Sequence, residues 1–376
     1  MPATQRPRVL LLIPHLGGGG AERVTALLAR ELSREKYELH LGVITQTAEE
    51  VGLAVAGVKV HALGARRVRG GALRLLRLVR RLRPDVILSG MAHLNFLVLL
   101  LRPFFPRKPR VLVRQNSTAS AALEFGGLPA YTRLLYRKLY RRADRVICQT
   151  EAMAADIASL AGIAAGKIAV LPNPIDSEAI GARGGGEPAD WPESGSAGPH
   201  LLAVGRLSKE KGIDLLFEAL AQVRSSFPGA NLLIAGTGPE EEALKQLCVD
   251  LKLQHAVRFA GHVDDPARYF SGATLFVLSS RHEGLPNALL EAAAGGLPIA
   301  ALPSSQGVVD LLRGQDGVWL AGDISAHALA EVLRIALSAL RTGERFAHRF
   351  VEPFRLENAI AAYEALIDQA MGESQR

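Results

Sequence analysis

Residues 274–292 read TLFVLSSRHEGLPNALLEA and contain the transition that decides the fold. The run from Thr274 to Ser279 is apolar between its two ends, which predicts a buried strand. Asn287 is a favourable N-cap residue, so we expect a helix to begin there. A strand, a short polar loop and a helix in this order form the repeating unit of a parallel α/β sheet.

The same alternation of short apolar runs and helical patterns continues on both sides of this stretch. Before residue 177, strands are predicted at 8–13, 38–45, 58–61, 85–89, 110–114, 145–149 and 168–171. After residue 199, strands are predicted at 200–205, 231–236, 256–261, 274–279, 298–301 and 318–321. The two series predict two Rossmann-like, doubly wound α/β domains, whose ligands bind beyond the carboxyl ends of the strands.

Length and composition agree with two domains. The chain has 376 residues, of which 48% are hydrophobic, and single cores rarely grow beyond ~250–300 residues. Residues 184–199, GGGEPADWPESGSAGP, lack periodicity and predict a linker. We therefore expect an N-terminal domain at 1–176, a linker at 177–199 and a C-terminal domain at 200–353. The last helical pattern, within 354–376, fits either domain and is assigned to the first.

Charge and cysteine content exclude several classes of protein. Lys and Arg outnumber Asp and Glu by 44 to 37, and the net charge of +7 favours anionic partners. Cys148 and Cys248 lack the paired spacing of a zinc site, and no disulfide framework is expected. The apolar runs 9–13 and 86–101 are too short for a signal peptide and a membrane span, respectively, so we expect a cytoplasmic protein.

Four consecutive glycines, Gly17 to Gly20, follow the first predicted strand and open a helix. Backbone N–H groups can approach a phosphate or a sugar closely at such a turn, and a helix N-terminus favours anions. A flexible turn without a ligand is the alternative. The spacing of Gly18, Gly20 and Arg23 does not match the last position of the nicotinamide motif G-x-G-x-x-G.

The second domain contains two polar motifs at predicted strand ends. Arg206 and Lys211 lie in the loop after strand 200–205, where two cations can converge on a diphosphate; a solvated charge cluster is the alternative. Glu283 lies in the loop of the opening stretch, and Glu291 lies one turn into its helix. Carboxylates placed in this way suit the binding of sugar or ribose hydroxyls rather than action as a paired acid and base.

Together these three segments resemble the retaining GT-B glycosyltransferases of family four, which include bacterial transferases for polysaccharides and lipid-linked glycans. Residues 283–291, EGLPNALLE, match the family's E-x7-E motif, and the likeness covers nearly the whole chain. The resemblance implies two domains facing a central cleft and transfer of a hexose or N-acetylhexosamine from a nucleotide-diphosphate sugar, with UDP as the first expectation. It also implies retention of the anomeric configuration without a cofactor or a metal, and the chain contains no Asp-x-Asp motif.

The resemblance also implies roles for individual residues. Arg206 and Lys211 would stabilise the diphosphate as it leaves, Glu291 would hold the ribose, and Glu283 would address the donor sugar. The other implied donor-binding positions are Gly18, Gly19, Gly205, Gly261, His262, Val263, Gly284, Leu285, Pro286, Asn287, Ala288 and Leu289.

Two loops depart from the family pattern. Many relatives have a histidine after the fifth strand, where this chain reads Arg114-Gln115-Asn116-Ser117. Either Asn116 lies near the anomeric carbon in its place, or His93, after strand 85–89, reaches that position; a structural role for His93 is the alternative. At 303–307, PSSQG replaces the paired glycines and glutamate of relatives, and Asp310 is a candidate substitute for the glutamate.

Arginines concentrate in the first domain. Arg66 to Arg83 contains eight arginines and no acidic residue: Arg66, Arg67, Arg69, Arg74, Arg77, Arg80, Arg81 and Arg83. Leu75, Leu78, Val79 and Leu82 share one face, which predicts an amphipathic helix packed on the sheet. With the basic, aromatic stretch Arg102 to Arg110 and a third basic stretch at 133–145, this helix predicts contact with an anionic membrane surface and a lipid-linked acceptor.

Two alternative functions remain to be compared with a transferase. A nucleic-acid-binding protein would explain the basic charge, but aromatic residues make up only 5% of the chain and no recognition module is found, so no nucleic-acid partner is expected. A GT-B sugar-nucleotide epimerase or a two-domain NAD-dependent oxidoreductase is the alternative among enzymes. An epimerase would need an acid and a base flanking the sugar in place of an acceptor cleft.

Overall fold

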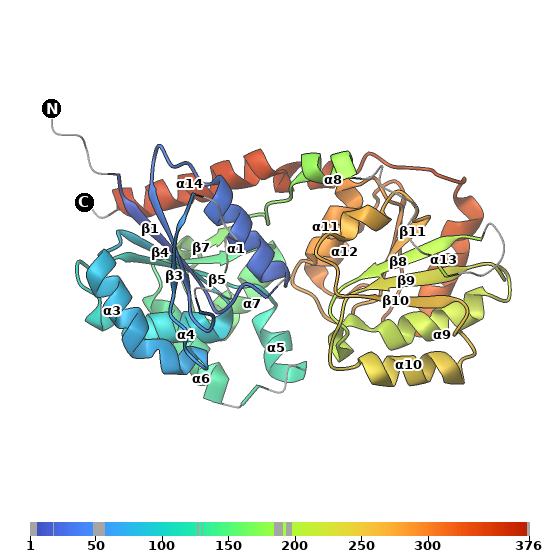
Figure 1. Cartoon of the computed structure of the whole chain (residues 1–376), viewed down its shortest axis with the longest axis horizontal. Helices are drawn as coiled ribbons and strands as arrows, with labels where there is room; N and C mark the ends of the chain where they lie inside the picture. Colours follow the sequence, from blue (N-terminus) through green and yellow to red (C-terminus); the bar gives the residue numbers. More distant parts are fainter. Residues whose placement is uncertain are drawn as a thin grey trace. The chain divides into compact units, whose positions relative to one another are not determined.

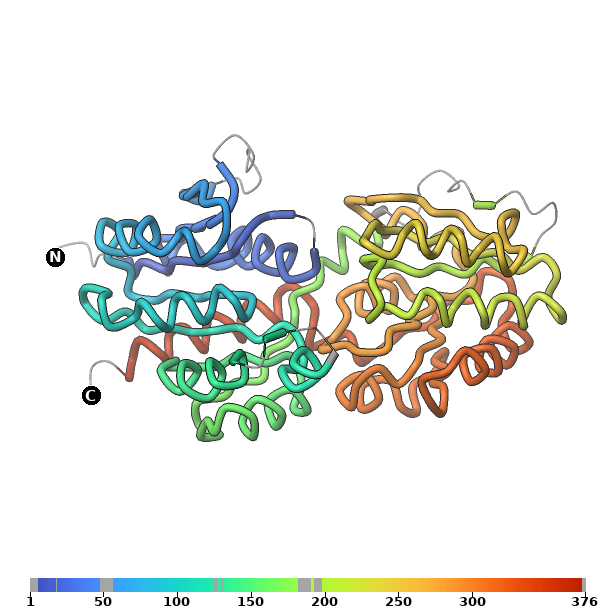
Figure 2. The backbone as a smooth tube through the Cα atoms, turned by 90° about the horizontal axis from the view of Figure 1, so that it is seen from below, coloured from blue at the N-terminus to red at the C-terminus, as the bar shows by residue number. Residues whose placement is uncertain are grey.

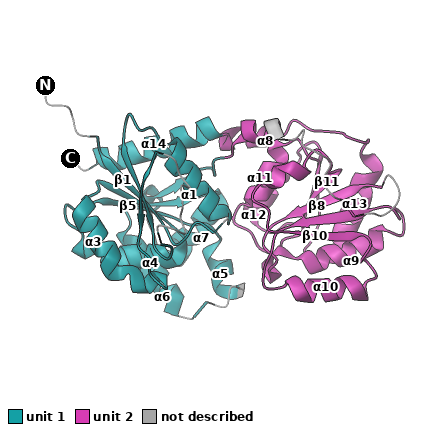
Figure 3. Cartoon of the chain, viewed as in Figure 1, with its two compact units in different colours: residues 1–174, 356–376 teal, residues 175–355 magenta. Residues whose placement is uncertain are grey.

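The computed structural model describes residues 6–17, 19–47, 57–125, 128–129, 131–183, 191–192 and 198–373. The chain divides into two compact units (Figures 1 and 3). Unit 1 comprises residues 1–174 and 356–376, and unit 2 comprises residues 175–355. The chain leaves unit 1 after Pro174, two residues before the end of the expected first domain, and returns to it at Leu356.

Unit 1 is built on a parallel sheet with the strand order β3-β2-β1-β4-β5-β6-β7. The strands are β1 (Arg8–Ile13), β2 (Glu38–Val43), β3 (Lys59–Ala62), β4 (Val86–Gly90), β5 (Arg110–Arg114), β6 (Arg145–Cys148) and β7 (Ile168–Val170). They confirm the predicted strands to within two residues. The central strands are apolar because both of their faces are covered, and residues 9–13 of β1 are fully buried.

Helices cover both faces of this sheet (Figure 1). On one face lie α3 (Ala72–Leu82), α4 (Ala92–Leu101), α6 (Tyr131–Leu139) and α7 (Glu151–Ala161), with the shorter α5 (Ala119–Phe125) preceding α6. On the other face lie α1 (Gly20–Glu31) and α14 (Leu356–Gly372). The apolar side of α3 is buried as predicted, through Leu75, Leu78, Val79 and Leu82.

The C-terminal helix α14 is an integral part of unit 1. Its buried Tyr363 and Ile367 share an apolar cluster with β1 and α1. The hydroxyl of Tyr37 donates to Asp368 at 2.6 Å, and the ammonium of Lys36 pairs with Glu364 at 2.6 Å. In Figure 2 the red C-terminal helix runs alongside the green part of unit 1, where Arg145 of β6 pairs with Glu373.

Unit 2 repeats the doubly wound arrangement, with the strand order β10-β9-β8-β11-β12-β13. The strands are β8 (His200–Val204), β9 (Asn231–Ala235), β10 (Val257–Gly261), β11 (Leu275–Leu278), β12 (Ile299–Ala301) and β13 (Val318–Leu320). One face packs against α9 (Ile213–Val223), α10 (Glu241–Asp250) and α13 (Ala326–Ala339). The other packs against α11 (Asn287–Ala294) and α12 (Gln306–Leu312). The predicted fold class is therefore confirmed: two parallel α/β domains.

The segment expected to be a linker, 177–199, is partly helical. Residues Ser177–Arg183 form α8, which contacts α11 and belongs to unit 2. Most of the Gly- and Pro-rich remainder lies outside the described residues. No helix in the described part of the chain is both long and apolar enough to cross a membrane.

Candidate active site

The order in which strands are added to the unit 2 sheet reverses between β8 and β11. The chain runs from β8 to β9 and β10 on one side and then returns to β11 on the other side of β8. The loops after β8 and β11 are therefore neighbours at the carboxyl edge of the sheet. Open α/β sheets bind their ligands at such a switch point.

The loop after β8 brings Lys211 over the end of the strand. Gly205 has φ +157, and a Cβ built there would lie 3.5 Å from Cε of Lys211, so the lysine side chain runs across this glycine. Residues Lys209–Lys211 form a 3₁₀ turn that ends at Gly212, with φ +60. A side chain at Gly212 would collide with the carbonyl of Ser279, so the close approach of the two loops requires glycine here.

The central contact of this edge joins the two predicted motifs. Lys211 Nζ lies 2.5 Å from Oε1 of Glu283, and the hydroxyl of Ser280 donates to the same oxygen at 2.8 Å. The Lys211 and Glu283 side chains are 24% and 11% exposed, respectively, so the pair is largely buried but still reaches the surface. The predicted diphosphate-binding and sugar-binding residues thus meet at one place.

Arg281 fixes the two loops to each other. Its guanidinium forms a two-pronged contact with Asp214 of α9, at 2.7 and 2.6 Å, and donates to the carbonyl of Lys209 at 3.0 Å. Its backbone N–H donates to the carbonyl of Glu210 at 2.7 Å. The contact with Asp214 raises the pKa of Arg281. Burial is the largest single influence and acts to raise the pKa of Asp214, but the hydrogen bond and charge of Arg281, together with backbone N–H groups, lower the pKa overall.

Arg206 lies in the same loop and is exposed. It contributes, with Lys211, to the charge around Glu210. Burial alone would raise the pKa of the Glu210 carboxyl, but a hydrogen bond from Ser208 and the nearby Lys211 and Arg206 lower it overall. The loop therefore holds two cations close enough to one carboxylate to lower its pKa.

Helix α11 begins at Asn287, but Asn287 is not its N-cap. Pro286 holds that position in an extended conformation without a side-chain cap, so the cap prediction was wrong by one residue. The proline fixes φ near the value that the position requires. Glu291 lies one turn into the helix, half-buried, as predicted.

The remaining predicted donor-binding residues differ in exposure. Gly284, Leu285, Pro286 and Leu289 are buried, and the Leu289 side chain packs in the apolar core, so only its backbone is available to a ligand. Ala288 is half-buried beside them.

The loop after β12 lies against this segment. The N–H of Glu283 donates to the carbonyl of Ser304 at 3.3 Å. Asp310, the candidate substitute for the family glutamate, accepts a hydrogen bond from Gln306 at 2.6 Å within α12.

The end of β10 supplies the last predicted donor-binding residues. Gly261 has φ +72 and accepts the N–H of Gly236 at 2.7 Å, which joins the ends of β9 and β10. His262 is exposed and lies 3.2 Å from Asp264, whereas Val263 packs on the apolar core. His262 is thus the polar side chain of this group that a ligand can reach.

Unit 1 has its own switch point, between β1 and β4. Gly19 is the N-cap of α1, and a Cβ there would lie 2.5 Å from the carboxylate of Glu22. A Cβ on Gly17 would lie 2.6 Å from Nδ1 of His15. These glycines make room for the His15 and Glu22 side chains, whose Nδ1 and Oε1 atoms are 3.6 Å apart. Gly18 lies outside the described residues.

The two candidates for the missing family histidine both lie at this edge. His93 is exposed, in the first turn of α4. Partial burial and the neighbouring His15 lower the pKa of His93, and Glu22 acts in the opposite direction. Asn116 follows β5. Its side-chain Oδ1 accepts from Arg114 at 2.6 Å, and its side-chain Nδ2 is buried and has no hydrogen-bond partner among the described residues.

His15 and Glu22 were not singled out from the sequence. Glu22 is 7% exposed in the first turn of α1. A carboxylate buried at a helix start, where the helix dipole favours it, was the available signal.

Among the described residues there is no group of three or more His, Cys, Asp or Glu side chains that could hold a metal ion. Independence from a metal stays a prediction.

Two protein-family models match the chain in separate ranges. Residues 18–179 match the model of Glycosyltransferase Family 4, and residues 198–338 match that of the Glycosyl transferases group 1. The chain is a glycosyltransferase. The match spans both units, with unit 1 and unit 2 each falling under one model.

Individual relatives agree with this class. This glycosyltransferase is 28% identical to the lipopolysaccharide core biosynthesis glycosyltransferase LpsE of Rhizobium meliloti, over 78% of this chain and 79% of that protein. It is 27% identical to the N-acetylgalactosamine-N,N'-diacetylbacillosaminyl-diphospho-undecaprenol 4-alpha-N-acetylgalactosaminyltransferase of Campylobacter jejuni, over 80% and 82%.

A solved structure confirms the fold. The crystal structure of Anabaena Alr3699/HepE in complex with UDP and glucose aligns with a TM-score of 0.75 at 18% identity, over 98% of this chain and 99% of that one.

Proposed function

We propose that this glycosyltransferase moves a hexose or N-acetylhexosamine from a nucleotide-diphosphate sugar, with UDP as the first candidate, to a glycan acceptor in the assembly of a cell-surface polysaccharide or lipid-linked glycan. The observation that carries the proposal is the meeting of Lys211 and Glu283 at the switch point of unit 2. The UDP in the HepE complex and the names of the two relatives support the donor and acceptor classes.

In the proposed mechanism the cations of unit 2 act on the leaving group. Lys211 exchanges part of its contact with Glu283 for the donor diphosphate, and Arg206 approaches from the exposed side of the loop. Charge develops on the phosphate as the bond to the sugar breaks, and preorganised cations stabilise such charge more in the transition state than in the ground state. Two fixed cations can fulfil this task without a divalent metal.

The carboxylates bind the neutral parts of the donor. Glu283 accepts from hydroxyls of the sugar, and Glu291 accepts from hydroxyls of the ribose, as charge-assisted hydrogen bonds. The acceptor hydroxyl attacks the face from which the phosphate departs and gives its proton to the departing phosphate oxygen. This retains the anomeric configuration without a protein nucleophile.

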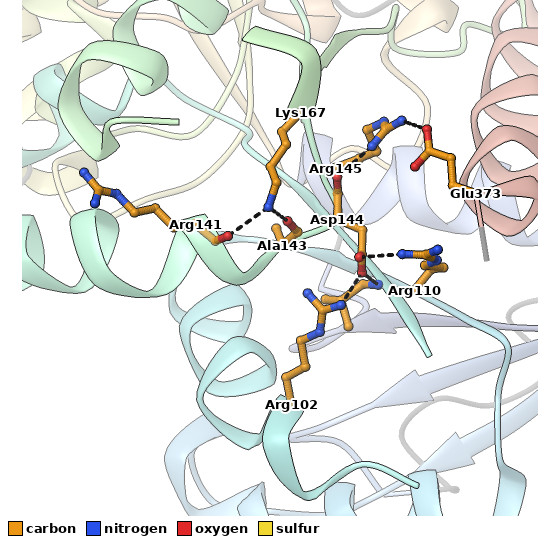
Figure 4. A network of polar contacts seen from close by, with 9 residues as sticks. Arg102, Arg110, Arg141, Ala143, Asp144, Arg145, Lys167 and Glu373 are labelled. Carbon is orange, nitrogen blue, oxygen red and sulfur yellow. Dashed lines mark hydrogen bonds and ion pairs between the residues drawn. The ribbon is translucent and has the colours of Figure 1, made fainter. Parts of the chain in front are cut away.

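We assign the acceptor to unit 1, with His93 and Asn116 as the candidate residues near the anomeric carbon. We also propose a cytoplasmic enzyme that reaches its acceptor at the membrane surface. The exposed arginines of residues 66–83 support this, whereas Arg102 and Arg110 pair with Asp144 at 2.7 and 3.1 Å and are tied into the fold (Figure 4).

The test is a product analysis with purified protein, UDP-sugars and a glycan acceptor in the presence of EDTA. We expect release of UDP, a product with the same anomeric configuration as the donor by proton NMR, and an unchanged rate on chelation. A donor that is epimerised without an acceptor would replace the transferase with an epimerase. Loss of turnover with EDTA that magnesium restores would contradict the metal-free mechanism.

A further inference from the structure

A groove between α6 and α7 of unit 1 plays no part in the proposed reaction so far. Its cavity measures about 380 Å³, within the range of small-ligand sites. Arg133 and Arg137 line it from α6, Arg141 from the turn that follows, and Asp156 and Ser159 from α7. Ser120, at the start of α5, lines it too.

The three arginines stand in one row. They are four residues apart, so they project from the same side of the helix and its continuation. With a rise of 1.5 Å per residue, Arg133 and Arg141 are separated by about 12 Å along the axis. All three are exposed. The row therefore offers several guanidinium groups to one phosphate-bearing ligand.

The groove carries an excess of positive charge. The side chains of Arg133 and Arg137 have no ion pair or hydrogen bond within the part of the chain that the structure describes. Asp156 is the one carboxylate among the lining residues, and its Oδ2 already accepts the N–H groups of Ala119 and Ser120 at 2.8 and 3.1 Å. Elsewhere in unit 1, by contrast, Arg102 and Arg110 share Asp144 (Figure 4).

Arg141 is held in place by the end of α7. Its Nε donates to the carbonyl of Ala161 at 3.0 Å, and its own carbonyl accepts from Lys167 at 3.1 Å. The guanidinium lies over Gly162, where any side chain would collide with it, and Gly162 has φ +62. In Figure 4 the Arg141 side chain points away from the Asp144 cluster. The guanidinium is therefore oriented before a ligand arrives.

Apolar side chains stand beside the arginines on α6. Tyr131 is 64% exposed and Leu134 is 51% exposed. Leu134 is three residues before Arg137 and thus its neighbour on the helix surface. A ligand that is complementary to this surface has a phosphate group that binds the arginines and an apolar chain that packs on Tyr131 and Leu134.

We propose that the groove between α6 and α7 binds the phosphate of a lipid, with Arg133, Arg137 and Arg141 as its ligands. Guanidinium groups match phosphate oxygens in two-pronged contacts, which gives the row its selectivity. The inference rests on the lipid-linked acceptor of the proposed function, whose diphosphate is the first source of this chemistry. A phospholipid headgroup is the second source.

The test compares the full-length protein with the double variant Arg133→Gln/Arg137→Gln. Geranyl diphosphate, which has a short apolar chain, is titrated by calorimetry in saturating UDP, so that the unit 2 site is occupied. We expect binding to the wild type, at least about tenfold weaker binding to the variant, and no binding of geraniol. The control Arg313→Gln/Arg341→Gln removes the same charge from exposed positions of unit 2 and should leave the affinity unchanged.

A second arm distinguishes the two sources. Loss of geranyl diphosphate binding in Arg133→Gln/Arg137→Gln assigns the groove to the acceptor diphosphate. Loss of flotation with phosphatidylglycerol vesicles, but not with phosphatidylcholine vesicles, at unchanged geranyl diphosphate affinity assigns it to a headgroup. The proposal is overturned if neither changes, or if the unit 2 control Arg313→Gln/Arg341→Gln weakens binding equally. The UDP affinity of the wild type and of the same variants is measured in parallel. A wild-type protein that does not bind UDP would contradict the proposed function and not the proposal for the groove.

Discussion

In unit 2 the switch point between β8 and β11 holds a lysine paired with a carboxylate, whereas in unit 1 the switch point between β1 and β4 holds two histidines and a carboxylate. Both sites lie at the carboxyl edge of a parallel sheet after a glycine-containing turn. The fold thus provides the same position twice, and the side chains decide what it binds. Fixed cations suit a diphosphate, and neutral imidazole and amide groups suit a hydroxyl-bearing acceptor.

The largest effect on the unit 2 site is expected at Arg281, which has no counterpart among the described residues of the unit 1 site. Arg281→Ala removes the contact with Asp214 and releases Lys211 from its place beside Glu283. Because small misplacements of catalytic groups cost about 100-fold, we expect kcat/KM to fall by about that factor. Steady-state kinetics of UDP release measures it.

Arg313→Ala, at an exposed position of the same unit, is the matched control for Arg281 and should keep full activity. Arg281→Lys keeps the charge but not the two-pronged geometry, so it should recover only part of the loss. Unchanged kinetics in Arg281→Ala, with an unchanged unfolding midpoint, would show that the two loops need no such fixation.

A smaller effect is expected in unit 1. His93→Gln should lower the transfer rate about tenfold and leave the KM for the donor unchanged, because the donor phosphate performs the proton transfer and His93 positions the acceptor. His255→Gln, at an exposed position of unit 2, is the control. An increase in donor KM at unchanged kcat would place His93 in donor binding instead.

The decline of the transfer rate at acidic pH is a second test of the role of His93. The pKa of His93 is lowered, so its imidazole remains neutral at pH 7 and gains a proton only below the ordinary histidine value of about 6.5. Transfer should be constant from pH 7 upward and decline below that value. His93→Gln should remove this decline.

Strand positions could be predicted from the sequence because each buried parallel strand is a continuous apolar run. Residues 8–13 and 110–114 were predicted with the observed ends. The assignment of the last helix could not be settled in this way, since its apolar face fits either core; the contacts of Tyr37 and Lys36 with α14 connect segments more than 300 residues apart.

The candidate site could be predicted in part. Lys211 and Glu283 were both named, because each stands in a motif at a strand end, and the structure brings them together. The contact of Arg281 with Asp214 could not be foreseen, because the two residues are 67 positions apart in the sequence and share no motif. His15 and Glu22 were missed because their significance depends on the room left by Gly17 and Gly19.

The proposed mechanism requires Lys211 to bind the donor diphosphate without a metal, and the affinity for UDP measured by titration in EDTA reports on this contact. We expect Lys211→Ala to weaken UDP binding by about 10- to 100-fold. Lys209→Ala, two residues earlier in the same exposed turn, should leave it unchanged. Equal UDP affinity of the wild type and Lys211→Ala in EDTA would contradict the binding of the diphosphate by Lys211.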